Sequence, residues 1–207
     1  MPEPVELPSS HWVFGYGSLV DPRSLGRTLG RPVELHVDFL EAELEGWGRR
    51  WNYGVGHVTG AWRTADGRMV VDGVIVALGV VPSAGERTNG IIARVSATEL
   101  AALDLRERDY DRIDVTDQVT VAGRGGAPAS PGVPARERIV TYVPRPSAID
   151  RYESARDAGL AGIRDTYWGL VDAAFAVLGP DRLHAYRATT PAPDIPVVAM
   201  IESVVHS

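Results

Sequence analysis

Two long stretches of β-type pattern constrain the fold of this chain more than any other feature of its sequence. Apolar and polar residues alternate from Val33 to Glu45, and the phase switches at Phe39–Leu40, which predicts a long strand with a bulge there. Residues 69–81 are almost continuously apolar, which predicts two buried strand segments or one strand bent at a glycine. Long, bent strands favour a strongly curved mixed sheet or a small β-barrel.

Helix signals flank these strands, so we expect an α+β fold with flanking helices. Asp21-Pro22 combines a helix N-cap with proline at the first helical position and predicts a short helix to about Leu29. Residues 96–99 have the form of a capping box and predict a helix from Ala97 to about Leu105.

The last third of the chain shows mainly helical spacing. Apolar residues recur at this spacing over 163–178, and Gly179-Pro180 ends the pattern, while residues 195–201 suit a late strand. We expect residues 1–207 to form a single domain with a helical C-terminal extension over about 148–207.

A Gly-, Pro- and Ala-rich segment, residues 122–136, separates two alternating stretches, 113–121 and 137–143. The two stretches predict a hairpin pair. The segment between them is long for a hairpin loop, and we interpret it as a tolerated surface insertion, with a mobile flap as the alternative.

Composition excludes several kinds of chemistry. The 207 residues include no cysteine, and all 21 basic residues are arginine, so disulfides, a cysteine nucleophile and a Schiff-base lysine are excluded. The net charge of −6 argues against binding to nucleic acid or anionic membranes. Residues 1–10 lack the pattern of a signal peptide, and no apolar stretch reaches the roughly 18 residues of a membrane span. We expect a cytoplasmic protein.

The histidines do not predict a metal site. No two of them have a metal-ligand spacing, and we expect no metal: His11, His36, His57, His184 and His206.

The turn Gly15-Tyr16-Gly17-Ser18-Leu19 is the first candidate site. Its glycines permit close backbone approach, and successive N–H groups in such a turn can cradle an anion. Dinucleotide and phosphate-loop patterns do not fit, because the third glycine and the lysine are missing, and the nucleophile-elbow pattern is absent too. The alternative is an ordinary glycine-rich turn between a strand and a helix.

The segment from Leu103 to Tyr110 is the second candidate site, and seven of the ten residues from Asp104 to Ile113 are charged. It contains Glu107 and lies where the predicted helix ends and a loop begins, a common place for catalytic groups. The alternative is a solvated turn with arginine–glutamate pairs.

Together these segments resemble the γ-glutamylcyclotransferase superfamily. The resemblance follows the family's order and is carried by five pieces: Val13–Leu19, Leu44–Trp51, Asn89–Val95, Leu103–Glu107 and Tyr142. Leucine at position 19 is similar to the ChaC-like, glutathione-specific branch. Residues 52–60 and the C-terminal third do not resemble that branch.

The resemblance implies a cofactor-independent enzyme. In the reaction, the substrate's α-amine attacks its own γ-glutamyl carbonyl, which releases 5-oxoproline and an amine, amino acid or peptide. A small γ-glutamyl compound is the implied partner, whereas the leaving group and the oligomeric state stay open.

The resemblance also implies roles for particular residues. Glu107 is the acid–base catalyst, which moves the proton from the attacking to the leaving nitrogen. The backbone amides of Tyr16–Leu19 hold the α-carboxylate or the developing oxyanion. The remaining substrate-binding candidates are Tyr110 or Tyr142 at the reacting carbonyl and Arg49 or Arg50 at a distal carboxylate.

Two alternatives to this activity remain. One is a non-catalytic γ-glutamyl-like ligand binder or regulatory protein, and the other is a cyclotransferase that removes a γ-glutamyl group during biosynthesis. An enzyme requires Glu107 inside the pocket formed by the glycine turn, whereas a binding module can leave it exposed.

Overall fold

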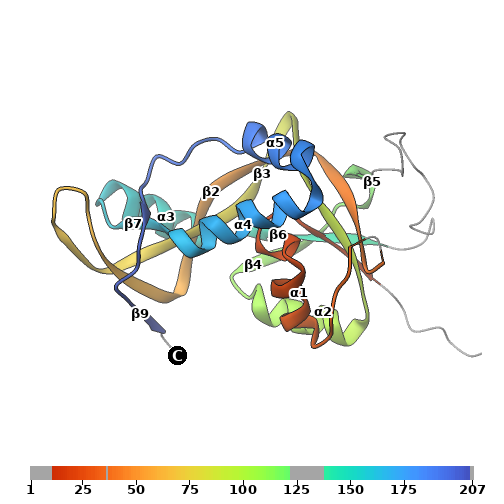
Figure 1. The fold of residues 1–207 in the computed structure, drawn as a ribbon, viewed down its shortest axis with the longest axis horizontal. Coiled ribbons are helices and arrows are strands. Elements are labelled where there is room, and N and C mark those ends of the chain that lie inside the picture. The colour runs from red at the N-terminus through yellow and green to blue at the C-terminus, as the bar shows by residue number, and fades with distance from the viewer. Residues whose placement is uncertain (1–10, 36, 122–137, 206–207) are drawn as a thin grey trace, which may run out of the picture.

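The computed structural model describes residues 11–35, 37–121 and 138–205. This part of the chain folds into one mixed sheet of nine strands with five α-helices around it (Figure 1). The sheet curls strongly but does not close, so the predicted α+β class and curved sheet are confirmed, and the barrel alternative is wrong.

A long antiparallel hairpin forms the centre of the sheet. Strands β2 (Phe39–Arg63) and β3 (Met69–Val95) pair along almost their whole length. The predicted start of β2 at Val33 is wrong, because Asp38 folds the preceding segment into a turn by accepting a hydrogen bond from the backbone N–H of Glu34 at 2.9 Å. The change in alternation at Phe39–Leu40 therefore marks the start of β2 and not a bulge. The irregularities in the pairing of β2 with β3 lie further along, the first between Glu45 and Trp47.

The other main strands extend the hairpin in the order β4-β6-β1-β3-β2-β5. Their bounds are β1 (His11–Gly15), β4 (Tyr110–Asp114), β5 (Val119–Val121) and β6 (Ile139–Pro144). β4 pairs with β6, but of the predicted stretch 113–121 only Ile113 and Asp114 take part, and β5 pairs with β2 instead, so most of the predicted hairpin is wrong. A 3₁₀ turn at Thr116–Gln118 separates β5 from β4. The predicted loop over 122–136 lies outside the described residues.

Both helices predicted from the capping residues at their first turns are confirmed. α1 spans Pro22–Leu29 and α2 spans Ala97–Arg106. Asp21 caps α1 by accepting a hydrogen bond from Ser24 N, and a capping box begins α2. Because α2 ends where predicted, Glu107 follows it directly as the C-cap residue.

The C-terminal third contributes strands as well as helices. Its elements are α3 (Pro146–Asp157), β7 (Ala161–Arg164), α4 (Asp165–Leu178), α5 (Pro180–Thr189), β8 (Val197–Val198) and β9 (Glu202–Val205). The predicted end of α4 at Gly179-Pro180 is confirmed, but residues 161–164 form β7, so the helix begins later than its apolar pattern. β7 pairs with β3 and β9 with β2, which ties this segment to the central hairpin.

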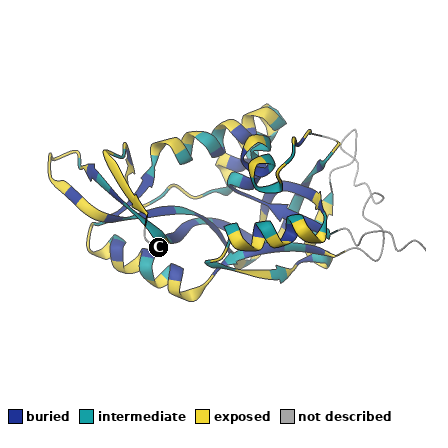
Figure 2. Ribbon diagram, turned by 90° about the horizontal axis from the view of Figure 1, so that it is seen from below, coloured by how far each residue is buried: buried dark blue, intermediate teal, exposed yellow. Residues whose placement is uncertain are grey.

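The core lies between the curled sheet and the helices. Figure 2 shows buried residues along the sheet and on the helix sides that face it, whereas the outer helix sides are exposed. Phe14, Leu44, Ile92 and Leu103 are completely buried and belong to one cluster. In the part of the chain described, no helix is long and apolar enough to cross a bilayer.

Candidate active site

The glycine turn packs directly against the central hairpin. β1 ends at Gly15, and a short 3₁₀ turn at Ser18–Val20 precedes α1. A Cβ added at Gly90 of β3 would lie 2.2 Å from the carbonyl oxygen of Gly15, and one added at Gly15 would lie 2.8 Å from Leu19 Cβ. Bare backbone at both positions therefore allows this close approach.

The turn presents free backbone donors. The N–H groups of Val20 and Asp21 donate to the carbonyls of Gly17 and Ser18. For the N–H groups of Gly17, Ser18 and Leu19, the described residues supply no backbone acceptor. Such unpaired groups at the start of a helical turn suit an anionic or partly negative oxygen.

Arg49 supports this turn from within the core. Its guanidinium is fully buried, donates from Nε to the carbonyl of Tyr16 at 2.9 Å and also bonds Asn89. The rings of Phe175 and Tyr186 lie on it, with centroids 5.0 and 4.9 Å from Cζ. Burial lowers the pKa of Arg49 to about 10, which leaves the side chain charged at neutral pH. The predicted substrate-binding arginine thus lies beneath the turn.

Glu107 is largely shielded from solvent, with its side chain 14% exposed. Burial raises the pKa of its carboxyl above the ordinary value, and this effect exceeds the lowering effect of Arg106, whose Nε lies 2.9 Å from Oε1. A carboxyl with a raised pKa exchanges protons more readily near neutral pH than an exposed one.

Arg106 connects Glu107 to the glycine turn. Its Nη2 donates to Ser18 Oγ at 2.8 Å, while Nη1 donates to Thr28 Oγ1 at 2.8 Å and to the carbonyl of Ser24 at 3.1 Å. One guanidinium therefore positions the acid, the turn and helix α1 relative to one another.

Two adjoining pockets meet at Glu107. The inner pocket, of about 30 Å³, is lined by Phe14, Tyr16, Gly17, Ser18, Leu19, Leu78, Glu107, Tyr110, Tyr142 and Tyr167. The outer pocket, of about 300 Å³, is lined by Ser18, Tyr53, Val55, His57, Val58, Ile75, Val76, Ala77, Arg106, Glu107, Tyr110, Arg164 and Tyr167. The predicted residues Tyr16–Leu19, Glu107, Tyr110 and Tyr142 line the inner pocket, whereas Arg49 and Arg50 do not. The two pockets share Ser18, Glu107, Tyr110 and Tyr167.

Three tyrosines of the inner pocket already donate their hydroxyl hydrogens to protein acceptors. Tyr16 donates to the carbonyl of Tyr142 at 2.7 Å, Tyr110 to that of Leu78 at 3.0 Å, and Tyr142 to Asp104 Oδ1 at 2.8 Å. Burial raises the pKa of all three, so they are protonated at neutral pH. The predicted carbonyl donors, Tyr110 and Tyr142, are thus engaged within the protein.

Tyr167, from α4, is a site residue that the sequence does not reveal. It lines both pockets, and its hydroxyl oxygen lies 3.3 Å from the position a Cβ would take on Gly17. Burial raises its pKa to about 12, against smaller lowering effects of hydrogen bonds with Leu78 and Ser18. Its place in the apolar helical pattern indicates only a core residue.

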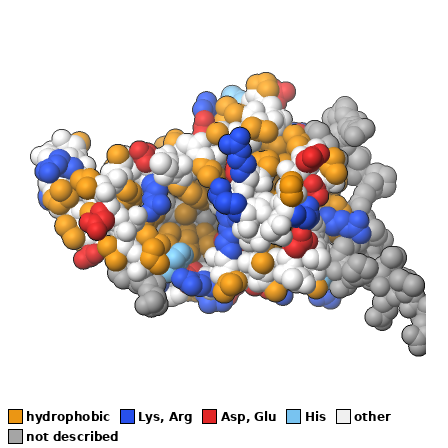
Figure 3. Space-filling model, turned by 60° about the horizontal axis from the view of Figure 1, so that its bottom comes forward, with side chains coloured by type: hydrophobic (Ala, Val, Ile, Leu, Met, Phe, Trp, Pro, Cys, Tyr) orange, Lys and Arg blue, Asp and Glu red, His pale blue; other side chains and the backbone are white. Residues whose placement is uncertain are grey.

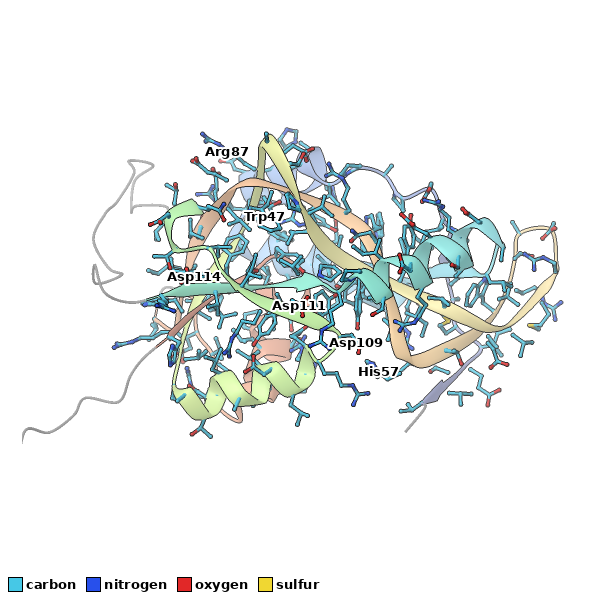
Figure 4. All side chains as sticks on the ribbon, turned by 180° about the vertical axis from the view of Figure 1, so that it is seen from behind. Trp47, His57, Arg87, Asp109, Asp111 and Asp114 are labelled. Atoms are coloured by element: carbon cyan, nitrogen blue, oxygen red, sulfur yellow. The ribbon has the colours of Figure 1, made fainter. Side chains whose placement is uncertain are left out.

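The outer pocket takes several side chains from an irregular part of the hairpin. Gly54 pairs with Val76 and Thr59 with Val74, so β2 has extra residues between these pairs. This segment supplies His57, whose Nδ1 lies 3.8 Å from Asp109 Oδ2. Figure 4 shows the two labelled side chains close together, near the place where the ribbons of β2 and β3 overlap in that view. Figure 3 shows a hollow with an apolar floor, flanked by basic side chains.

A metal site is not evident in this region. Across the described ranges, no three histidine or carboxylate side chains are grouped so as to hold an ion.

Comparison with known proteins gives matches only to solved structures. No protein-family model and no curated protein matches the sequence. An uncharacterized human protein matches over 92% of this chain and 94% of its own, with 15% identity and a TM-score of 0.50. A γ-glutamyl cyclotransferase matches over the same shares with 14% identity and a TM-score of 0.49. A yeast γ-glutamyl cyclotransferase specific to glutathione matches over 90% of both chains with 15% identity and a TM-score of 0.47.

At these identities the likeness concerns the fold. The chain is an α+β protein built on a curled, unclosed mixed sheet, an architecture that it shares with the human protein. Proteins named γ-glutamyl cyclotransferases are among the matched structures, but at TM-scores of 0.49 and 0.47 the family resemblance carried by the sequence motifs stays a prediction.

Proposed function

We propose that this protein is a γ-glutamyl cyclotransferase with Glu107 as its acid–base catalyst. The observation that carries the proposal is the placement of one shielded carboxyl, with a raised pKa, in the wall of both pockets beside Ser18 of the glycine turn. Burial of a carboxyl opposes its charged form and is therefore a cost to the protein. An acid–base catalyst uses the raised pKa that results, whereas a protein that only binds a ligand does not need it.

Glu107 moves protons between the two nitrogens of the substrate. Its carboxylate takes a proton from the α-ammonium, and the resulting amine attacks the γ-carbonyl carbon to close a five-membered ring. The carboxyl then protonates the leaving nitrogen as the original amide C–N bond breaks. Glu107 then takes the second proton from the ring nitrogen and passes it to the released amine, so the α-ammonium loses two protons and the amine leaves as an ammonium. Charge and protons therefore balance without a cofactor.

The inner pocket stabilises negative charge on the substrate. At about 30 Å³ it admits a small group and not a whole γ-glutamyl chain. We assign it to the oxygen that becomes negative in the ring-closing step, held by the free N–H groups at 17–19 and by the hydroxyl of Tyr167. Donors set in advance around such an oxygen are among the strongest contributions to catalysis. The rest of the substrate occupies the outer pocket.

A substrate panel with isosteric variants tests this function. Purified protein is incubated with γ-glutamyl amino acids, γ-glutamyl amines and glutathione, and 5-oxoproline is quantified by mass spectrometry. The variant Glu107→Gln keeps the shape of the side chain and removes its acid–base function, so we expect the rate to fall about 10²–10⁴-fold. Glu153→Gln, an exposed position on α3, is the matched control with expected normal turnover.

Two results contradict the proposal. Near-normal turnover by Glu107→Gln refutes the assignment of the catalyst. Binding of a γ-glutamyl compound without release of 5-oxoproline by the unaltered protein favours the ligand-binding alternative.

A further inference from the structure

The outer pocket combines an apolar wall with an unpaired arginine. Val55 and Val58 from β2, together with Ile75 and Val76 from β3, supply apolar lining. Arg164 ends β7 and also lines this pocket, and its Nε is buried without a hydrogen-bond partner. Arg164 as a whole is partly exposed, so the cost of a missing partner concerns this one buried N–H group, and an acceptor on a ligand would remove it.

The other basic groups of this pocket each have an acidic neighbour. Arg106 pairs with Glu107, and His57 Nδ1, which is buried without a hydrogen-bond partner, lies 3.8 Å from Asp109 Oδ2. For Arg164, by contrast, the described residues offer no acidic group within ion-pair distance. Asp165, its neighbour in sequence, is exposed and accepts a hydrogen bond from the backbone N–H of Thr166. The outer pocket therefore has one unmatched positive charge beside an apolar surface.

We propose that the outer pocket binds the leaving group and selects an apolar α-amino acid whose carboxylate pairs with Arg164. The substrate class is then a γ-glutamyl conjugate of such an amino acid. The apolar wall receives the side chain, and Arg164 gains the acceptor that the protein does not supply. A cationic leaving group, such as a diamine, is disfavoured because its charge would face Arg164. This inference rests on the proposed cyclotransferase function.

Several outer-pocket residues come from segments of the chain that do not resemble the family's glutathione-specific branch, which agrees with a substrate specificity particular to this chain. Val55, His57 and Val58 come from the shifted part of β2, and Arg164 comes from the C-terminal third. Both segments lack resemblance to the glutathione-specific branch, whereas the glycine turn and Glu107 carry the family motifs. The segments that depart from the family therefore form the part of the site that would contact the leaving group.

A matched pair of substrates isolates the carboxylate. γ-L-Glutamyl-L-leucine and γ-L-glutamyl-isoamylamine differ only in the carboxylate of the leaving group, and 5-oxoproline release gives kcat/KM for each. We expect the full chain to prefer the leucine compound at least about tenfold, since a hydrogen bond to a charged group has about that effect. Arg164→Gln is expected to abolish the preference through a higher KM for the leucine compound, and Arg164→Lys to restore part of it.

Controls separate this effect from a general loss of structure. The isoamylamine compound serves as an internal control, because it lacks the carboxylate and its turnover is expected to fall less in Arg164→Gln than that of the leucine compound. Arg138→Gln removes an equal charge from a side chain that is 80% exposed and is expected to keep the preference. Equal turnover of both compounds by the unaltered protein, or an undiminished preference in Arg164→Gln, overturns the inference and leaves the cyclotransferase function intact.

A binding measurement decides the inference independently of turnover. If neither compound yields 5-oxoproline, the proposed function fails, and isothermal titration of both compounds into the unaltered protein and Arg164→Gln gives the answer. Tighter binding of the leucine compound that is lost in the variant supports the inference. Absence of binding, or equal binding of both compounds, overturns it.

Discussion

The guanidinium of Arg106 lies against the carboxyl of Glu107, with Nε 2.9 Å from Oε1. The two residues are adjacent in sequence, yet their effects on the acid oppose each other: burial raises the pKa of Glu107 and Arg106 lowers it. The contact therefore limits how far burial raises the pKa. The same guanidinium also bonds Ser18, so it joins the acid to the glycine turn.

The pH dependence of turnover follows from this contact. Glu107 must be ionised to accept a proton, so kcat/KM is expected to fall as pH falls through its raised pKa. Arg106→Gln removes the positive charge that lowers this pKa, and the acidic limb is expected to move to higher pH. Rates of 5-oxoproline release measured against pH at constant ionic strength check the shift. Arg108→Gln, an exposed neighbour, is the charge-matched control. An unmoved limb in Arg106→Gln contradicts the prediction.

The four inner-pocket tyrosines are expected to differ in their effect on catalysis. The hydroxyl of Tyr167 is assigned to the reacting oxygen, and removal of one such donor costs about 10²–10³-fold in kcat. We expect a loss of this order for Tyr167→Phe. Tyr142→Phe removes a hydroxyl that donates to Asp104 and is expected to have a much smaller effect. Steady-state kcat and thermal midpoints of both variants provide the comparison, and a larger loss for Tyr142→Phe would reverse the assignment.

Adjacent arginines on β2 are expected to differ in their effect on stability. Arg49→Met leaves the buried carbonyls of Tyr16 and Asn89 without a donor, which costs about 1–3 kcal/mol for each group. Arg50 pairs with Glu86 near the surface, where such pairs contribute about 0–1 kcal/mol, so Arg50→Met is the matched control. Urea unfolding measures both losses. Unchanged stability of Arg49→Met with a raised KM for substrates that carry a distal carboxylate would instead support the substrate-binding role expected from the sequence.

Local signals in the sequence predict the elements that carry the family motifs. Asp21-Pro22 and the capping box at 96–99 fix helix starts through contacts within a few residues, so their predictions hold. Which distant segments pair as strands is harder to predict from the sequence. Nothing in the short pattern of 119–121 distinguishes pairing with β6 from the observed pairing with β2, because three alternating residues suit either partner.

The candidate site also contains some residues that the sequence predicts and some that it does not. Glu107 and residues 15–19 are recognisable from sequence because they resemble the motifs of a known family in that family's order, whereas each segment alone also fits an ordinary turn. Tyr167 and Arg164 are not, because an aromatic residue in a helical pattern and a lone arginine have common structural explanations. Their place at the site depends on the pairing of β7 with β3, which brings the start of α4 to the two pockets.

The close approach of the glycine turn to β3 yields a final pair of variants. Gly90→Ala introduces a Cβ 2.2 Å from the carbonyl oxygen of Gly15, and because that atom belongs to the backbone, the turn itself must move. We expect a stability loss of about 1–3 kcal/mol, together with a loss of turnover as the free N–H groups at 17–19 are displaced.

Gly169→Ala is the matched substitution in α4, where an added Cβ meets no atom within 4 Å. It is expected to stabilise the protein by about 1 kcal/mol through helix propensity and to leave turnover unchanged. Thermal unfolding and 5-oxoproline release measured on both variants give the comparison. Normal stability and normal turnover in Gly90→Ala would show that the turn does not depend on this contact, and the oxygen-binding assignment of its N–H groups would then lose its structural basis.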